Sequence, residues 1–206
     1  DWTYYSEFDI DEGFHHSSQL YLELNRIDTF SEVYLNGAPV GTTNNMFLRY
    51  RFDVTKTAVP GKNRLEIKFT SPVRRALELK RQLPYPIPHQ DYPVQAQGRN
   101  LIRKVQCHAG WDWGPCLMVC GIYEPVRLCS TELERIEAVH HEAELSESSE
   151  NRWSLQVTTE LYSRFAGRTK LRIECAGVVT EQEIELNGGL HKVISDLEVI
   201  NPQLWW

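Results

Sequence analysis

Hydrophobic residues recur at every second position along several short stretches of this 206-residue sequence. The side chains of a β-strand point alternately to opposite faces of a sheet, so this period predicts strands with one buried and one solvated face. Stretches of this kind are separated by turn residues and occur along the whole chain, which favours an all-β fold built from sandwiches. The alternating residues are Trp2, Tyr4, Phe8 and Ile10; Leu20, Leu22 and Leu24; Leu65, Ile67 and Phe69; Trp153, Leu155, Val157, Thr159 and Leu161; and Leu171, Ile173 and Cys175.

Turn and capping residues indicate where regular structure begins and ends. Asn36-Gly37 is the strongest hairpin signal, because both residues tolerate the positive φ angles of a tight turn. Residues 71–80 are the one good helix candidate, with Ser71 as the N-cap and a proline in the first turn. Three prolines within residues 83–88 exclude a helix there and predict an extended surface loop. Asn187-Gly188-Gly189 predicts a further tight turn between strands.

A glutamate-rich run over residues 132–150 separates two alternating regions of the chain. Runs of like charge are usually solvated surface, so we interpret this one as an exposed face rather than a binding site. A length of 206 residues suits one large or two modest domains. We therefore predict two β-sandwich domains, residues 1–129 and residues 130–206.

Charge and hydrophobicity exclude two classes of partner. The net charge is −6, and no run of Lys and Arg with interleaved aromatic residues is present, which argues against nucleic acid. No apolar stretch approaches the roughly 20 residues that a membrane span requires, so we predict no membrane partner.

Five cysteines, an odd number, cannot all pair with one another. Four of them, Cys107, Cys116, Cys120 and Cys129, lie around residues 111–113 and could suggest a metal site together with His108. Their spacing contains no C-x-x-C pair of the zinc type, so we predict no metal site and no cofactor. Buried free thiols are the preferred interpretation and favour a reducing compartment, although one bridge, Cys116–Cys120 or Cys107–Cys129, stays open. The sequence leaves the localisation undetermined.

The stretch Arg103–Pro115, which reads R-K-V-Q-C-H-A-G-W-D-W-G-P, carries the clearest chemical signal. Trp111 and Trp113 flank Asp112. Indole faces stack on the C–H face of a sugar ring, and a fixed carboxylate accepts hydrogen bonds from neighbouring hydroxyls. The basic residues at the start of the stretch could keep that carboxylate ionised. The competing interpretation is structural, because a single W-D-W in a β-rich domain is more often core and turn than binding site.

The W-D-W-G-P stretch at residues 111–115 resembles a loop of β-mannosidases, which are multidomain enzymes of glycoside hydrolase family two. Other stretches resemble the same enzymes in the same order, so the similarity runs nearly from end to end. They are W-T-Y-Y (2–5), D-T-F-S-E-V-Y-L-N-G (28–37), N-M-F (45–47), F-D-V (52–54), G-K-N-R-L (61–65), G-I-Y-E-P-V (121–126) and N-P-Q-L-W-W (201–206).

The resemblance implies a jelly-roll, galactose-binding-like sandwich in residues 1–129 and an immunoglobulin-like sandwich in residues 130–206. It also implies that two glutamates on a later (β/α)₈ barrel carry the retaining chemistry, the acid/base glutamate following an asparagine. No Asn-Glu dipeptide occurs here, and no strand–helix alternation could supply a barrel of about 250 residues. We therefore expect a piece of a larger hydrolase, without catalytic residues and inactive by itself. Either sandwich could be incomplete at the ends of the chain.

The resemblance also implies roles for individual residues. Asp112 would accept hydrogen bonds from hydroxyls of a mannose in the −1 subsite, and Trp111 and Trp113 would shape and dry the wall of that pocket. If Lys104 and Gln106 alternate on one side of a strand, both would face the pocket or buttress Asp112. The expected partners are a β-mannoside or oligosaccharide substrate and the catalytic barrel domain of the same longer chain.

The sequence supports two alternatives. An independent carbohydrate-binding module would bind sugar on aromatic residues such as Trp2, Tyr4, Tyr85 and Tyr92. A structural domain of another family-two hydrolase, such as β-galactosidase or β-glucuronidase, would present a face made for other domains. The W-D-W motif by itself forms only one wall of a pocket, and one wall rarely outweighs the cost of immobilising a ligand. The W-D-W-G-P loop favours the β-mannosidase branch.

Overall fold

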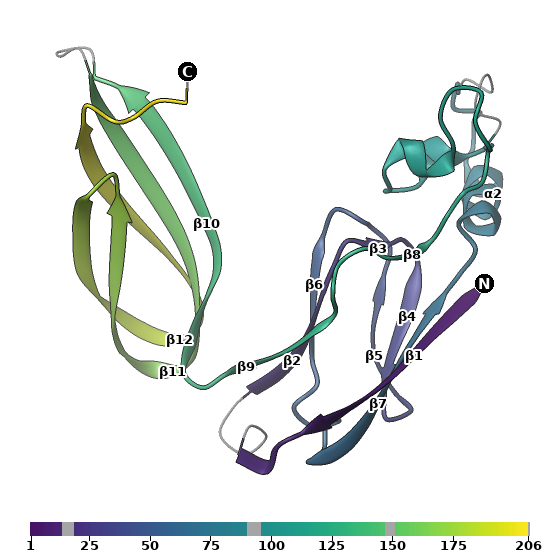
Figure 1. Cartoon of the computed structure of the whole chain (residues 1–206), viewed down its shortest axis with the longest axis horizontal. Coiled ribbons are helices and arrows are strands. Elements are labelled where there is room, and N and C mark those ends of the chain that lie inside the picture. Colours follow the sequence, from purple (N-terminus) through teal and green to yellow (C-terminus); the bar gives the residue numbers. More distant parts are fainter. Residues whose placement is uncertain (14–18, 90–95, 147–150, 206) are drawn as a thin grey trace. The chain divides into compact units, whose positions relative to one another are not determined.

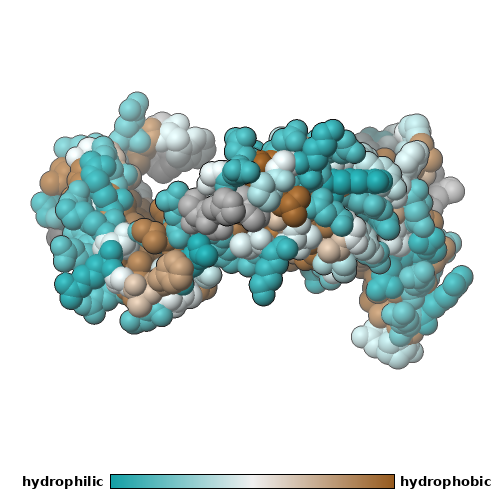
Figure 2. Space-filling model, turned by 90° about the horizontal axis from the view of Figure 1, so that it is seen from below, coloured by the Kyte–Doolittle hydropathy of each residue, from teal (hydrophilic) through white to brown (hydrophobic). Residues whose placement is uncertain are grey.

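The computed structural model describes residues 1–13, 19–89, 96–146 and 151–205. The chain divides into two compact units, Asp1–Ser130 and Thr131–Trp206, and the predicted boundary lies one residue before this division. Tyr92, which the carbohydrate-module alternative uses, lies outside the described residues. The face seen in Figure 2 is mostly hydrophilic and carries separate hydrophobic patches. Among the described residues, no helix combines the length and the apolar character needed to cross a membrane.

Unit 1 contains two main sheets and a short two-stranded ribbon (Figure 1). Its strands are β1 (Trp2–Ile10), β2 (Gln19–Asn25), β3 (Ile27–Asp28), β4 (Ser31–Leu35), β5 (Ala38–Thr43), β6 (Arg49–Asp53), β7 (Gly61–Phe69), β8 (Gly121–Ile122) and β9 (Arg127–Thr131). The first sheet has the order β1-β7-β4-β5 and the second the order β6-β2-β9, while β3 pairs with β8 in the ribbon.

The core of unit 1 draws on both main sheets and confirms the alternation predicted for two strands. β2 contributes Leu20, Leu22 and Leu24, and β7 contributes Leu65, Ile67 and Phe69, all of them buried. Each such side chain contributes roughly 1.5–3 kcal/mol by leaving water. The alternating pattern therefore identifies side chains of β2 and β7 whose burial stabilises unit 1.

The prediction for β1 is wrong in its N-terminal half. Trp2 is 69% exposed and Tyr4 is 45% exposed, whereas Ile10 is buried and Phe8 packs against the core. Within the described residues, β1 is an edge strand that pairs with β7 on one side only. Tyr4 and Phe8 line an open groove of about 440 Å³ that is also lined from β2, β8 and β9. The aromatic face of β1 is therefore only partly covered by other side chains.

The predicted hairpin and helix are confirmed. Asn36 and Gly37 connect β4 to β5 with φ angles of 53° and 82°. Helix α2 (Pro72–Gln82) starts after Ser71, whose side-chain oxygen accepts a hydrogen bond from the backbone N–H of Arg74 at 3.4 Å. The helix ends at an extended residue just before the first proline of the 83–88 loop, since a residue that precedes proline disfavours helical backbone.

Unit 2 is an antiparallel sheet of β10 (Glu134–Leu145), β11 (Arg152–Cys175) and β12 (Val178–Ile200), with β11 in the middle. The predicted alternation is confirmed at the centre of β11, where Val157, Thr159 and Leu161 are buried. Residues 139–145 of β10 are exposed, which confirms that this part of the glutamate-rich run is a solvated face.

The tight turn predicted at Asn187-Gly188-Gly189 is wrong. These residues lie inside β12, opposite an irregularity in β11 where the register shifts between Ser163 and Ala166. The two glycines have φ angles of 77° and 85°, so they serve a bulge in the strand pair instead of a chain reversal. The reversal occurs at Ala176-Gly177, with φ angles of 49° and 80°. Both units are built mainly from strands, and the predicted all-β class is confirmed.

Candidate functional site

The W-D-W motif lies on a loop whose two ends are joined by a hydrogen bond. The loop begins at the last residue of the short 3₁₀ helix η2 (Gln106–Ala109). Further along the chain, the backbone N–H of Val119 donates to the carbonyl oxygen of His108 at 3.1 Å. We call residues 109–118, which lie between these two residues, the W-D-W loop. Its ends are held together, while residues 111–117 in its middle are exposed.

Two glycines shape the W-D-W loop. Gly110 leaves η2 with a φ of 117°, and a Cβ added there would lie 2.9 Å from the carbonyl oxygen of Pro115. Both the backbone angle and the close approach require glycine at this position. The N–H of Gly114 donates to the carbonyl oxygen of Trp111 at 3.1 Å and closes a turn around the motif.

The three residues of the motif lie at the surface. Trp111 is 70% exposed, Trp113 is 80% exposed, and Asp112 between them is exposed as well. The interpretation of W-D-W as packed core is therefore wrong. Among the residues that the structure describes, none forms a hydrogen bond or an ion pair with the Asp112 carboxylate. Two indole side chains and a carboxylate thus lie together at the surface of unit 1.

A second carboxylate, Asp28, lies buried beneath the loop. Its Oδ2 accepts from the Nζ of Lys104 and from the Nδ1 of His108, each at 3.0 Å. Its Oδ1 accepts from the hydroxyl of Thr29. The side chains of Asp28 and Lys104 are 0% and 1% exposed, so this is a buried ion pair. Asp28 is not among the site residues predicted from the sequence, because no local pattern links it to His108, which lies 80 positions further along the chain.

The expectation for Lys104 and Gln106 depended on a strand that is not present. Gln106 begins the 3₁₀ helix η2, so the two side chains do not alternate on one strand face. Lys104 is buried against Asp28, whereas Gln106 is exposed beside the W-D-W loop. Lys104 therefore pairs with a core carboxylate, and only Gln106 lies where a ligand could reach it.

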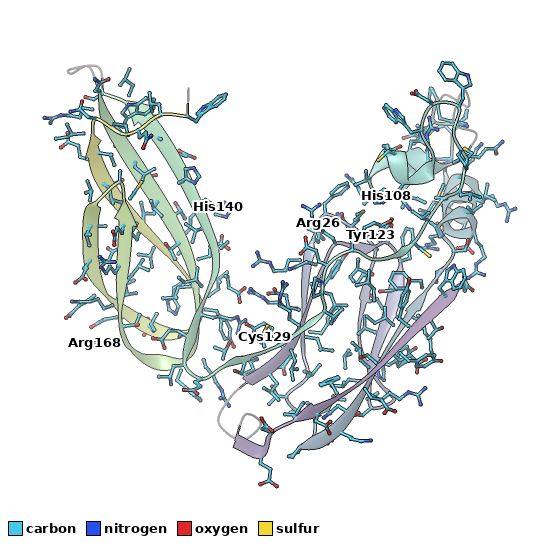
Figure 3. The ribbon with its side chains drawn as sticks, viewed as in Figure 1. Arg26, His108, Tyr123, Cys129, His140 and Arg168 are labelled. Atoms are coloured by element: carbon cyan, nitrogen blue, oxygen red, sulfur yellow. The ribbon has the colours of Figure 1, made fainter. Side chains whose placement is uncertain are left out.

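Aromatic stacking fixes the ring of His108. The ring centroids of His108 and Tyr123 lie 4.8 Å apart, and the angle between the ring planes is 16°. Figure 3 shows the two labelled residues close together in unit 1. Burial raises the pKa of the Tyr123 hydroxyl, and the nearby Asp28 carboxylate raises it further. The same two causes raise the pKa of the Cys120 thiol, which therefore stays protonated to higher pH than an ordinary thiol.

The cysteines near the loop are thiols, but the prediction that they are buried is wrong for Cys107 and Cys116, which are exposed. Neither bridge that the sequence left open, Cys116–Cys120 or Cys107–Cys129, is formed. The Sγ of Cys116 instead lies 3.4 Å from the carbonyl oxygen of Ala109, within the W-D-W loop. Within the described ranges, no group of three or more His, Cys, Asp or Glu side chains is arranged to hold a metal ion.

Comparisons with known proteins identify relatives over the whole chain. The family described as "Glycosyl hydrolase 2 galactose-binding domain-like" matches residues 1–124. The β-mannosidase of Bos taurus is 40% identical over 131 residues, which cover 62% of this chain and 15% of that protein. β-Mannosidase B of Emericella nidulans is 32% identical over 214 residues, covering 100% of this chain and 24% of that protein.

Among solved structures, the β-D-mannosidase from Dictyoglomus thermophilum is similar with a TM-score of 0.83 and 30% sequence identity. The match covers 100% of this chain and 25% of that one. The chain thus spans about a quarter or less of the length of these relatives. The predicted resemblance to β-mannosidases of glycoside hydrolase family two is confirmed, and the all-β architecture agrees with it. By its match over residues 1–124, the chain belongs to the glycosyl hydrolase 2 galactose-binding domain-like family.

Proposed function

We propose that these residues are a non-catalytic, sugar-binding portion of a β-mannosidase-like glycoside hydrolase that removes terminal β-D-mannose. The observation that carries the proposal is the exposed Trp111-Asp112-Trp113 group on a loop whose ends are tied to the core of unit 1. The similarity to β-mannosidases over the full chain supports the choice of sugar. The W-D-W loop would form one wall of the −1 subsite of a longer enzyme.

The chemistry of the motif suits this part of a sugar site. The Asp112 carboxylate would accept hydrogen bonds from hydroxyls of the mannose, away from the glycosidic bond that is cut. Trp111 and Trp113 would stack against apolar C–H surface and exclude water. A hydrogen bond to a charged group contributes roughly 1.5–3 kcal/mol. Binding energy from such remote contacts can be used to distort the sugar toward the transition state.

The remaining candidate residues receive different roles in the proposal. Gln106, exposed beside the W-D-W loop, would contact the substrate or the rim of its pocket. Lys104 would act only indirectly, because its ammonium group is buried against Asp28. This assignment differs from the expectation that both side chains act together.

The reaction itself would belong to residues outside this chain. We propose a retaining mechanism, in which two carboxyl groups roughly 5–5.5 Å apart act as nucleophile and acid/base. They would lie on a catalytic barrel domain of the same longer protein, which would complete the pocket around the W-D-W loop. This division of labour needs no cofactor, and the 206-residue chain by itself would be inactive.

Replacement of Asp112 by asparagine tests the proposal. Asparagine keeps the shape of the side chain but removes the charge that strengthens its hydrogen bonds to hydroxyls. In the longer protein, we expect Asp112→Asn to lower kcat/KM for a chromogenic β-mannoside by about tenfold to a hundredfold. Thermal melting should be unchanged, because Asp112 is exposed.

A matched substitution separates this effect from a general loss of charge. Asp9→Asn changes an exposed carboxylate in β1 and should leave kcat/KM within about twofold of the parent value. If Asp112→Asn retained the parent kcat/KM, the substrate-binding role of the loop would be refuted. Tight sugar binding by the 206-residue chain without the barrel would instead favour the carbohydrate-module alternative.

A further inference from the structure

The Asp28 carboxylate has a fixed set of partners. Its Oδ2 accepts from Lys104 and His108 at 3.0 Å each, and its Oδ1 accepts from Thr29. Asp28 itself is held in β3, where it pairs with Gly121 of β8. Burial of a carboxylate is costly unless opposite charge and hydrogen bonds compensate it, so a group in this environment holds its partners in defined positions.

The two basic partners of Asp28 hold opposite ends of the W-D-W loop, His108 by its place in the chain and Lys104 by a contact with Val119. His108 immediately precedes the loop and donates to Asp28 through Nδ1. Lys104 reaches the other end, because its Nζ also donates to the carbonyl oxygen of Val119. The N–H of Val119 in turn donates to the carbonyl oxygen of His108. Both ends of the loop are thereby tied to one buried carboxylate of the core.

The position of the loop's tip depends on these ties. The side chain of Asp112 is exposed, so packing around it does little to fix where its carboxylate lies. A displacement of about 1 Å at a substrate-positioning group can reduce the reaction rate by about a hundredfold. A carboxylate on such a loop therefore needs its ends clamped.

We propose that Asp28, Lys104 and His108 are positioning residues, which hold the W-D-W loop so that Asp112 meets its substrate in one orientation. This inference rests on the proposed function of Asp112 and adds residues that touch no substrate. Their contribution to activity passes through Asp112 and is lost when Asp112 is replaced.

His108 is the best member of the clamp to replace. Its side chain is 21% exposed, compared with 0% for Asp28 and 1% for Lys104. Removal of Asp28 or Lys104 would leave an unpaired buried charge and endanger folding. Asparagine and glutamine at position 108 separate the effect of the hydrogen bond to Asp28 from the effect of a polar side chain. The amide nitrogen of asparagine lies as many bonds from Cβ as Nδ1 of histidine, whereas that of glutamine lies one bond further.

The experiment compares His108→Gln and His108→Asn in the longer protein, each with and without Asp112→Asn. With Asp112 present, His108→Gln should lower kcat/KM for a β-mannoside by about tenfold to a hundredfold, and His108→Asn should restore most of it. In the Asp112→Asn background, His108→Gln should change kcat/KM by less than about threefold, since coupled residues lose their effect together.

Controls keep the outcomes distinct. His140→Gln replaces an exposed histidine of β10 and should leave kcat/KM unchanged. If His108→Gln fails to fold, Tyr123→Leu removes the ring stacked on His108 at a 47% exposed position and should show the same coupling to Asp112. An equal loss in both backgrounds, or no loss with Asp112 present, overturns the positioning role. No effect of Asp112→Asn by itself refutes the proposed function instead.

Discussion

Asp28 and Asp112 carry the same side chain in opposite environments. Asp28 is fully buried, and its charge is compensated by Lys104 at 3.0 Å. Asp112 is exposed, and no partner among the described residues engages its carboxylate. The first arrangement stabilises the protein only while both partners are present, and the second leaves a charged group available for binding. The two carboxylates are linked through His108, which contacts Asp28 and immediately precedes the W-D-W loop that carries Asp112.

A single glycine provides a test of this loop at the residue scale. Gly110→Ala would place a methyl group 2.9 Å from the carbonyl oxygen of Pro115 and strain a backbone with a φ of 117°. We expect it to lower the free energy of unfolding by roughly 1–3 kcal/mol, measured by urea denaturation. Gly167→Ala is the matched control, because no atom lies within 4 Å of the position that its added methyl group would occupy. Equal stability of the two variants would contradict the strained geometry of the loop.

The candidate site could be predicted from the sequence only in part. The motif identified Asp112 and its flanking indoles because all three are adjacent in the chain. The pairing of Asp28 with His108 joins residues separated by 80 positions, so no local pattern contains it. Lys104 shows the same limit, since its supposed place on a strand face suggested a pocket residue, while its partner Asp28 lies in a strand far away in the sequence.

At the scale of elements, the alternation of hydrophobic residues predicts which face of a strand is apolar. It does not predict whether other parts of the protein cover that face. It was correct for β2 and β7, which lie next to other strands on both sides. It failed at the start of β1, where the aromatic face borders an open groove at a sheet edge. Paired glycines were equally ambiguous, because a positive φ suits both a tight turn and a bulge. In each of these cases, contacts with other parts of the protein, and not the local sequence, determined the structure.

The buried face of β2 gives a test at the element scale. Leu22 is 1% exposed in the core of unit 1, whereas Leu48 is 50% exposed. We expect Leu22→Ala to cost about 2–5 kcal/mol of unfolding free energy, because it removes a core side chain and leaves a cavity. Leu48→Ala, the same chemical change at the surface, should cost about 1 kcal/mol or less. Similar costs for both in urea denaturation would contradict the placement of the core.

At the scale of the whole molecule, fold and chemistry rest on different observations. The family match over residues 1–124 accounts for the first sandwich, and the chain covers about a quarter of the length of full-chain relatives. A shared sandwich fold does not specify a reaction, because the same folds support many functions. The proposed activity therefore depends on the W-D-W loop and on a catalytic domain that would complete its pocket.

The most direct test of the central claim is hydrolysis of chromogenic glycosides by the longer protein and by the 206-residue chain. We expect the longer protein to cleave a β-mannoside and to be much less active on a β-galactoside and a β-glucuronide. The 206-residue chain should cleave none of them. Hydrolysis by the 206-residue chain would contradict the account, because its own carboxylates would then perform the reaction. A preference of the longer protein for another sugar would contradict the assignment to β-mannosides.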